Sequence, residues 1–297
     1  MMKTKLMRLC AGVLALGMVS ARGVSAKGPY DAPPPIYTCY KISAPVTIDG
    51  KLSDVFWKDI PRMPFAELAS GGPPWFDCYC QAAWDDKYLY VAFWGADPDV
   101  VASVRPGLLP KELPLIKHRT GKMIPTFEGF PFIMLHDPLF MVFINPDADG
   151  RNHEEFHINA LNTVNYWWFE RGSTSREWQD LSCGKDNMHL DWDCEGLQHA
   201  VWVYGTLNDS SDTDVGWSAE LAIPFSALKQ FTKGSIPPRP GDAWAVHTGW
   251  EYRPGLDQPR IYWTWPVIGI VDDHQLWRFG KFVFAGTLEA GPVNSKK

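Results

Sequence analysis

The chain has 297 residues, of which 45% are hydrophobic and 14% aromatic, so it can bury a large core. Its 28 basic and 34 acidic residues give a formal net charge of −6 at pH 7. An acidic surface repels phosphate backbones, so the composition argues against a nucleic acid as partner.

The N-terminus has the pattern of a secretory signal peptide. Basic residues precede an apolar run, Leu9–Val19, and Val-Ser-Ala triplets then offer cleavage after Ala21 or Ala26. The run is too short to span a bilayer, which takes roughly 20 residues. We expect residues 1–26 to be removed, which takes away four basic residues and no acids and lowers the net charge from −6 to −10. The mature protein should be secreted or periplasmic and not inserted in a membrane.

The next residues, 27–35, are rich in proline and predict an extended linker. We expect one domain over residues 36–286 and a tail over 287–297. Short strand-like runs follow one another along this domain, and turn signals such as Asp85-Asp86 separate them. The predicted strands are Ile36–Tyr40, Val46–Ile48, Tyr79–Trp84, Tyr88–Trp94, Leu139–Ile144, Glu154–Ala160, His199–Gly205, Gly216–Ile223, Trp244–Arg253, Ile261–Trp265 and Phe279–Ala285.

Helical signals are sparse. The best candidates are Leu52–Asp59 and Phe225–Phe231, the second of which starts after a proline. Residues 100–135 have neither helical nor strand periodicity and predict a long loop. Many short strands with few helices predict an all-β fold, a two-sheet antiparallel β-sandwich of the jelly-roll kind.

Five of the six cysteines lie beyond residue 26. Cys183 and Cys194 flank a polar loop of ten residues, and in an exported protein we expect a disulfide between them. Cys78 and Cys80 lie on the same side of any strand, and Cys39 is a candidate partner for either of them. The odd count leaves at least one free thiol.

Six segments couple strand-like alternation to recognisable turns or helix starts. They are Val46–Trp57, Ala82–Val91, Phe140–Gly150, Glu155–Thr163, Trp217–Phe225 and the pair Tyr262–Pro266 with His274–Gly280. In this order they resemble the family 9 carbohydrate-binding-module-like domains, secreted β-sandwiches found beside or within polysaccharide-degrading enzymes. The resemblance implies that the protein binds a poly- or oligosaccharide without cutting it. It also implies a link to carbohydrate catabolism, with a glycoside hydrolase as a candidate partner.

In that family two tryptophans sandwich a terminal sugar, with help from Glu, Arg, Asn and Gln side chains. The resemblance places the first tryptophan near Leu135 and the second at Asp272–His274. It places the Glu at Met141 and the Arg at His157, and only Asn159 keeps its identity. It therefore implies that any sugar site in this chain uses other aromatic residues.

Polar candidates for such a site lie on one strand and one loop. His157 and Asn159 point to the same face of their strand and can give the directional hydrogen bonds that sugar hydroxyls require. His274 matches a position near the second sandwich tryptophan in a bacterial subgroup of the family. The alternative is that these side chains fix the hairpin and the next loop.

Fifteen tryptophans are available, and most of them should lie in the core. Trp167 and Trp168 are neighbours in a strand, so one of them should face away from the core. Trp263 and Trp265 share one face of their strand. We expect stacking platforms for a sugar among these four residues, with core packing as the alternative.

The turn Asp147-Ala-Asp149-Gly-Arg-Asn152 spaces oxygen ligands two or three residues apart. Calcium prefers clustered carboxylate and carbonyl oxygens, and members of the resembled family often bind it structurally. The sequence predicts Asp147, Asp149 and Asn152 as calcium ligands, and a plain turn is the alternative.

We expect no catalytic residues. Glycoside hydrolysis needs two carboxylates about 5–10 Å apart, and no recognisable motif marks such a pair. Two alternatives to sugar binding stay open. One is an interaction module of the same fold, and the other is a haem carrier, because related sandwiches bind haem through a Met and a basic ligand. Candidate pairs are Met134 with His136, Met141 with His157, and Met188 with His189.

Overall fold

The computed structural model describes residues 32–105, 116–117, 123–124, 136–172, 187–255 and 258–288. The predicted signal peptide, most of the predicted linker and most of the predicted tail lie outside these residues. Cys183 and Leu135 also lie outside them.

The described part of the chain consists mainly of strands, with three helical elements that follow or precede them. The strands are β1 (Ile36–Lys41), β2 (Met63–Pro64), β3 (Ala66–Glu67), β4 (Cys78–Trp84), β5 (Tyr88–Gly95), β6 (Ile116–Lys117), β7 (Met123–Ile124), β8 (Leu139–Asn145), β9 (Arg151–Asn159), β10 (Val164–Arg171), β11 (Met188–His189), β12 (Gln198–Tyr204), β13 (Gly216–Pro224), β14 (Ala243–Tyr252), β15 (Ile261–Trp265) and β16 (Gly280–Thr287). The helical elements are η2 (Val55–Lys58), α1 (Phe225–Leu228) continued by η7 (Lys229–Phe231), and η8 (Leu276–Arg278). None of the described helices is both long and apolar enough to cross a membrane.

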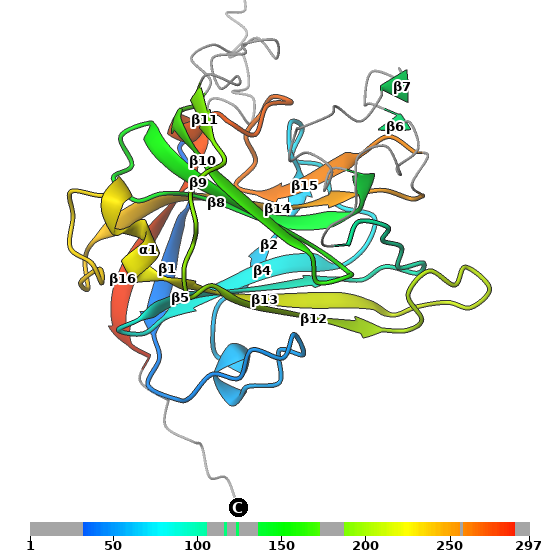
Figure 1. Ribbon diagram of the computed structural model, residues 1–297, viewed down its shortest axis with the longest axis horizontal. Coiled ribbons are helices and arrows are strands. Elements are labelled where there is room, and N and C mark those ends of the chain that lie inside the picture. Colours follow the sequence, from blue (N-terminus) through cyan, green and yellow to red (C-terminus); the bar gives the residue numbers. More distant parts are fainter. Residues whose placement is uncertain are drawn as a thin grey trace, which may run out of the picture.

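Fourteen of the strands form one continuous sheet that is folded into two layers (Figure 1), and β6 pairs with β7 in a separate two-stranded sheet. The order of the larger sheet is β11-β10-β9-β8-β14-β16-β1-β4-β5-β13-β12, and β15 pairs with β14 beside this path. One layer holds β8, β9, β10 and β14, the other holds β4, β5, β12 and β13, and β1 with β16 joins them along one side. The predicted all-β sandwich is confirmed. It is not purely antiparallel, because β1 pairs in parallel with both β16 and β4.

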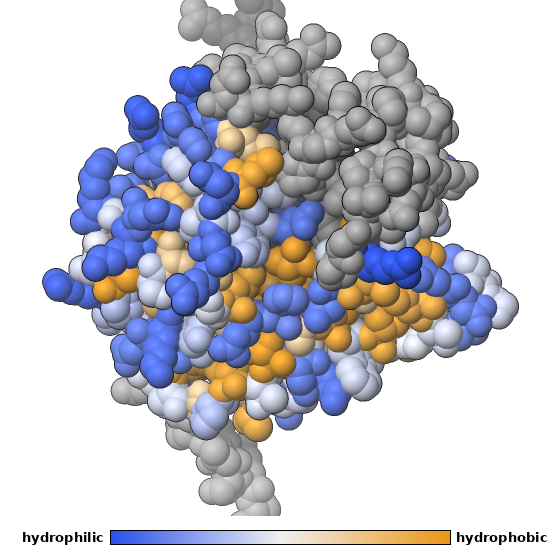
Figure 2. Space-filling model, viewed as in Figure 1, coloured by the Kyte–Doolittle hydropathy of each residue, from blue (hydrophilic) through white to orange (hydrophobic). Residues whose placement is uncertain are grey.

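The main core lies between the two layers. Phe93 of β5 stacks on Phe140 of β8 with ring centroids 5.0 Å apart, and Trp217 and Trp250 pack against Phe140. Hydrophobic residues gather along the band between the layers in the space-filling view, with hydrophilic residues on either side of it (Figure 2). The alternation of β8 sends Phe140, Val142 and Ile144 into this core.

Both layers are also covered on part of their outer faces. Every residue of β8 is buried, because Leu139, Met141 and Phe143 pack under Ile268, Leu276 and Phe279. On the other layer, the segment around η2 covers β13, and every residue of that strand is buried as well. Side chains on these outer faces are therefore enclosed by loops. Predicted site residues that lie there are buried.

Ten of the predicted strands are confirmed, nine of them within two residues at both ends, while β9 starts three residues before the predicted Glu154. The unconfirmed one is Val46–Ile48, which has no ladder partner because Thr47 donates its backbone N–H to the Asp54 carboxylate instead (2.8 Å). The predicted helix Phe225–Phe231 is confirmed as α1 and η7. The two-residue strands β2, β3, β6, β7 and β11 were not predicted, since two residues carry no periodicity. The predicted ranges also lack β10, although Trp167 and Trp168 were expected to lie in a strand.

Candidate functional site

A buried polar cluster lies on the outer face of β9. His153, Glu155 and His157 alternate along the strand, so all three side chains point to the same side, and each is at most 2% exposed. The neighbouring residues Phe156 and Ile158 point into the main core. The alternation that builds the core therefore also aligns these polar groups.

Glu155 is the centre of this cluster. Its Oε1 lies 3.0 Å from Nε2 of His153 and 3.1 Å from Nε2 of His274, while its Oε2 accepts a hydrogen bond from Nε1 of Trp167 (2.9 Å). Burial raises the pKa of Glu155, but His274 and His153 outweigh burial and lower the pKa to about 2. The carboxylate is therefore held ionised between two imidazoles.

His157 and Asn159 are buried rather than presented to a ligand. The ring of His157 stacks on Trp167 at 4.7 Å, and burial lowers the pKa of His157 to about 4. Nδ2 of Asn159 donates to the Val104 carbonyl (2.6 Å) and to Asp137 (2.8 Å), and its Oδ1 accepts from the Thr163 amide. The structure thus shows the hairpin-fixing arrangement that was the alternative to sugar binding.

The four predicted platform tryptophans differ in accessibility. Trp167 and Trp263 are 1% exposed, so neither offers a ring face to a sugar in this structure, and the expected platform is not formed by them. Trp167 is enclosed by His157 and Glu155, and Trp263 stacks on Tyr252 at 5.0 Å. Trp263 belongs to the main core, which is the alternative that the sequence left open, whereas Trp167 is buried among the polar groups on the outer face of β9.

Trp168 and Trp265 are partly exposed. Trp168 lies on the core side of β10 and packs against the main core, where its ring stacks on His189 of β11 at 4.0 Å and also packs on Phe231. Its neighbour Trp167 is the one that faces outward, toward Glu155. Trp265 lines a shallow pocket of about 480 Å³ beside Pro64 and Pro266. His274 is 24% exposed in its side chain, and its role in sugar binding stays a prediction along with that of these two tryptophans.

The predicted calcium turn has its carboxylates engaged by protein donors. Oδ1 of Asp147 accepts hydrogen bonds from the Thr232 hydroxyl (2.6 Å) and the Lys233 amide (3.0 Å). The Lys233 ammonium lies 3.9 Å from Asp147 and 3.6 Å from Asp149. Asn152 lies at the start of β9 and has a left-handed backbone conformation. Calcium binding by this turn stays a prediction.

The described cysteines are free thiols. Cys194 is buried against the main core. Cys183 lies outside the described residues, so the expected disulfide between them stays a prediction. Cys39, Cys78 and Cys80 are also buried and unbonded, which corrects the suggested pairing among them. Burial raises the pKa of Cys80 to about 12, so this thiol is inert as a nucleophile.

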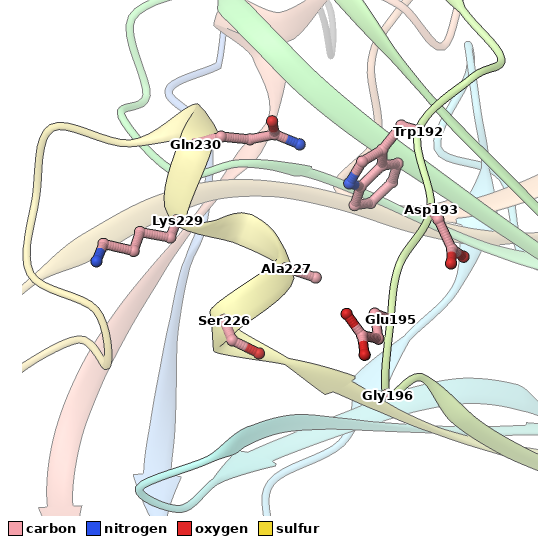
Figure 3. A pocket seen from close by; sticks show the side chains of 8 residues that line it. All are labelled: Trp192, Asp193, Glu195, Gly196, Ser226, Ala227, Lys229 and Gln230. Carbon is pink, nitrogen blue, oxygen red and sulfur yellow. The ribbon is translucent and has the colours of Figure 1, made fainter.

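A pocket of about 890 Å³ opens between the segment before β12 and the α1–η7 helix (Figure 3). One wall carries Trp192, Asp193 and Glu195, and the other carries Ser226 and Gln230. In Figure 3 the Gln230 amide extends toward the Trp192 ring and the Glu195 carboxylate points toward the helix, while Lys229 points away. Its volume exceeds that of the pocket beside Trp265, about 480 Å³, and that of a pocket lined by Tyr79 and Trp94, about 350 Å³.

Trp192 is held rigidly at the mouth of this pocket. Its ring makes perpendicular contacts with Phe156 (5.8 Å), Tyr166 (5.6 Å) and Phe231 (5.3 Å). The neighbouring Asp193 accepts a hydrogen bond from the Tyr166 hydroxyl (2.7 Å). Trp192 is partly exposed, so a fixed indole stands beside carboxylate, amide and hydroxyl groups.

No family model matches the chain, and no curated protein matches it. Among solved structures it is similar to a "putative carbohydrate-binding protein" from Bacteroides uniformis, with 14% identity, a TM-score of 0.53, and coverage of 84% of this chain and 99% of the other. The two proteins share their fold.

The chain is also similar to a carbohydrate binding module family 9 domain from Caldicellulosiruptor kristjanssonii in complexes with cellotriose and with glucose. The identity is 14% in both cases, the TM-scores are 0.49 and 0.48, and the matches cover 86% of this chain and 99% and 98% of the other chains. The fold shared with the Bacteroides protein agrees with the β-sandwich that the sequence resemblance implied.

The Trp192 pocket was missed by the sequence analysis. Trp192 stands alone between Asp191 and Asp193 in a stretch without strand or helix periodicity. An aromatic residue isolated in a polar loop was the available signal. The second wall comes from the helix after β13, and no sequence pattern brings that helix beside the loop.

Proposed function

We propose that the protein binds a carbohydrate without cutting it, and that the Trp192 pocket holds the sugar. The observation that carries this proposal is the fixed, partly exposed indole of Trp192 facing the polar helix wall. An aromatic ring stacks on the apolar face of a pyranose, and directional polar groups around it bind the hydroxyls. The fold shared with the Bacteroides protein supports the proposal.

The size and chemistry of the pocket suit a short oligosaccharide. A volume of about 890 Å³ falls within the range of ordinary ligand sites, roughly 300–1,000 Å³. Glu195 and Asp193 accept hydrogen bonds, Ser226 both donates and accepts, and the Gln230 amide does both as well. A neutral sugar with many hydroxyls matches this mixture better than an anion does, because two carboxylates stand on one wall.

The test is the variant Trp192→Ala, measured by glycan array and then by calorimetry on the best glycan. Removal of an anchoring aromatic should cost on the order of 2 kcal/mol, or about 30-fold in affinity. Gln230→Ala removes one hydrogen-bonding group and should cost about 5-fold.

The matched control is Trp202→Ala. Trp202 is a tryptophan with 43% exposure on β12, and its ring lies under the Lys51 ammonium. This variant should bind as the unmodified protein does. If Trp202→Ala loses binding and Trp192→Ala keeps it, the assignment of the pocket is wrong. If the unmodified protein binds no glycan, the interaction module becomes the better hypothesis.

We also infer export, with residues 1–26 as the signal, and action beside a glycoside hydrolase in polysaccharide catabolism. The N-terminal pattern and the family resemblance support these two points.

A further inference from the structure

Two histidines converge on one carboxylate in the buried cluster on β9. Nε2 of His153 and Nε2 of His274 both lie within 3.1 Å of the same oxygen, Oε1 of Glu155. His153 and Glu155 come from one face of the strand, whereas His274 comes from the loop after β15. The three ligand atoms all lie within 4.8 Å of one another.

We propose that His153, Glu155 and His274 bind a divalent transition-metal ion, and that zinc is the ion they suit. Two imidazole nitrogens and one carboxylate oxygen form a donor set that zinc accepts at about 2.0–2.2 Å. In a tetrahedral site with such bonds, neighbouring ligand atoms lie about 3.3 Å apart. The observed separations of 3.0 and 3.1 Å reach this value with small side-chain movements.

The surroundings of the ligands provide the support that metal sites need. Nδ1 of His274 lies 3.2 Å from Oδ1 of Asp273 and 3.6 Å from Oδ1 of Asp272. A ligating histidine usually donates its second N–H to a carboxylate, which orients the ring and strengthens the ligand. Glu155 is oriented too, because Trp167 donates to Oε2 of Glu155 and leaves Oε1 directed at the histidines. The third ligand, His153, has no such partner at its Nδ1 among the described residues.

Two further groups on this face are left without hydrogen-bond partners. Within the described residues, Nδ1 of His153 has no partner, and neither ring nitrogen of His247 has one, although both side chains are 0% exposed. His247 packs on the same Phe143 ring as His153 and His274. The Glu155 carboxylate does not need this many nearby imidazoles to satisfy its hydrogen bonds.

A second group, Asp272, Asp273 and His274, brings its atoms equally close but is a weaker candidate. Both oxygens of Asp272 are already used, by the His274 amide (3.0 Å) and by Nε2 of Gln275 (2.7 Å). Its two carboxylates therefore serve better as the supporting groups of His274 than as ligands. The ion reaches the proposed site from the side of His274, whose side chain is 24% exposed.

The test uses the full mature protein stripped with a chelator and titrated with zinc, with cobalt as a spectroscopic probe. We expect one ion per chain, a visible cobalt band typical of nitrogen and oxygen ligands, and a higher melting temperature with zinc. His274→Ala should weaken zinc binding by at least about 100-fold, and Asp273→Asn by about 10–100-fold.

The matched control is His189→Ala, which removes a histidine at the same distance, 3.0 Å, from a different carboxylate, that of Glu170. This variant should keep the one-to-one binding. His274 lies in a loop, so circular dichroism should show an intact fold for its variant. The proposal is wrong if the stripped protein binds no zinc at micromolar concentration, or if His274→Ala binds it as tightly as the unmodified protein. This outcome does not depend on sugar binding.

Discussion

At the scale of single residues, the folded state disfavours the ionised form of Asp97. It follows β5, is 2% exposed, and within the described residues its Oδ2 has no hydrogen-bond partner. Burial raises the pKa of Asp97 to about 7, and the nearby acids Asp99 and Asp214 add to this shift. The fold thus prefers a protonated Asp97 at a pH where the unfolded chain has lost that proton.

This preference predicts that Asp97→Asn changes the free energy of unfolding by an amount that depends on pH. The folded pKa of about 7 lies above the ordinary value of 3.8, so the ionisation of Asp97 lowers stability as pH rises between these two values. An asparagine side chain does not ionise, so the variant does not lose stability in this way. Its free energy of unfolding should match that of the unmodified protein near pH 4 and exceed it by roughly 2–4 kcal/mol at pH 8.

Urea denaturation at several pH values measures this difference. Asp212→Asn, which changes an exposed acid in the loop between β12 and β13, serves as the control and should show no such trend. If the free energies of unfolding of Asp97→Asn and the unmodified protein differ by the same amount from pH 4 to pH 8, the raised pKa of Asp97 is contradicted.

At the scale of elements, one side chain fastens the segment around η2 to the outer face of β13. Glu220 accepts hydrogen bonds from the amides of Asp49 (3.1 Å) and Gly50 (2.8 Å) and from Nε1 of Trp57 (2.9 Å). Glu220 is 1% exposed, so water does not replace these partners easily. The contact explains why a central strand of the sheet carries a glutamate among hydrophobic residues.

Glu220→Ala should therefore destabilise the protein by about 3–5 kcal/mol, since it leaves two buried donors and one partly buried donor without an acceptor. Trp57→Phe removes only one of these bonds and should cost about 1–2 kcal/mol. Chemical denaturation compares the two variants. Equal losses would mean that the packing of Trp57, and not the carboxylate, holds the segment.

At the scale of elements, the sequence predicts local structures better than contacts between distant segments. The hairpin β4–β5 is a local structure, because Asp85 accepts hydrogen bonds from Lys87 and Tyr88 within its own turn, and this hairpin was predicted within about a residue. Trp167 was judged from strand alternation, which describes only the two faces of the sheet. Trp167 is enclosed by Glu155 and His157, and Glu155 in turn pairs with His274 from far along the chain.

Both candidate sites have this non-local origin. The Trp192 pocket needs the helix after β13, and the proposed metal site needs a loop placed over β9. Periodicity and turn chemistry predict elements, and a family resemblance predicts their order. Neither predicts which loop covers which face, so the fold was largely predictable and the sites were not.

At the scale of the whole molecule, β1 joins the two layers into one sheet. It pairs in parallel with β16 on one side and with β4 on the other, so it lies between elements from the two ends of the described chain. The Tyr37 hydroxyl donates to the carbonyls of Pro61 and Ala82, both at 2.9 Å, and Cys39 is fully buried. The first strand is therefore part of the core and not an extension of the predicted linker.

Two truncated proteins test this role. A chain that begins at residue 32 keeps β1 and should melt at the same temperature as one that begins at residue 27. A chain that begins at residue 42 lacks β1, exposes the edges of β16 and β4, and loses the burial of Tyr37 and Cys39. Each large buried side chain contributes about 1.5–3 kcal/mol, so its melting temperature should fall by at least about 10 °C. Thermal circular dichroism measures this fall, and similar melting of the chains that begin at residues 32 and 42 would show that the two layers hold together without β1.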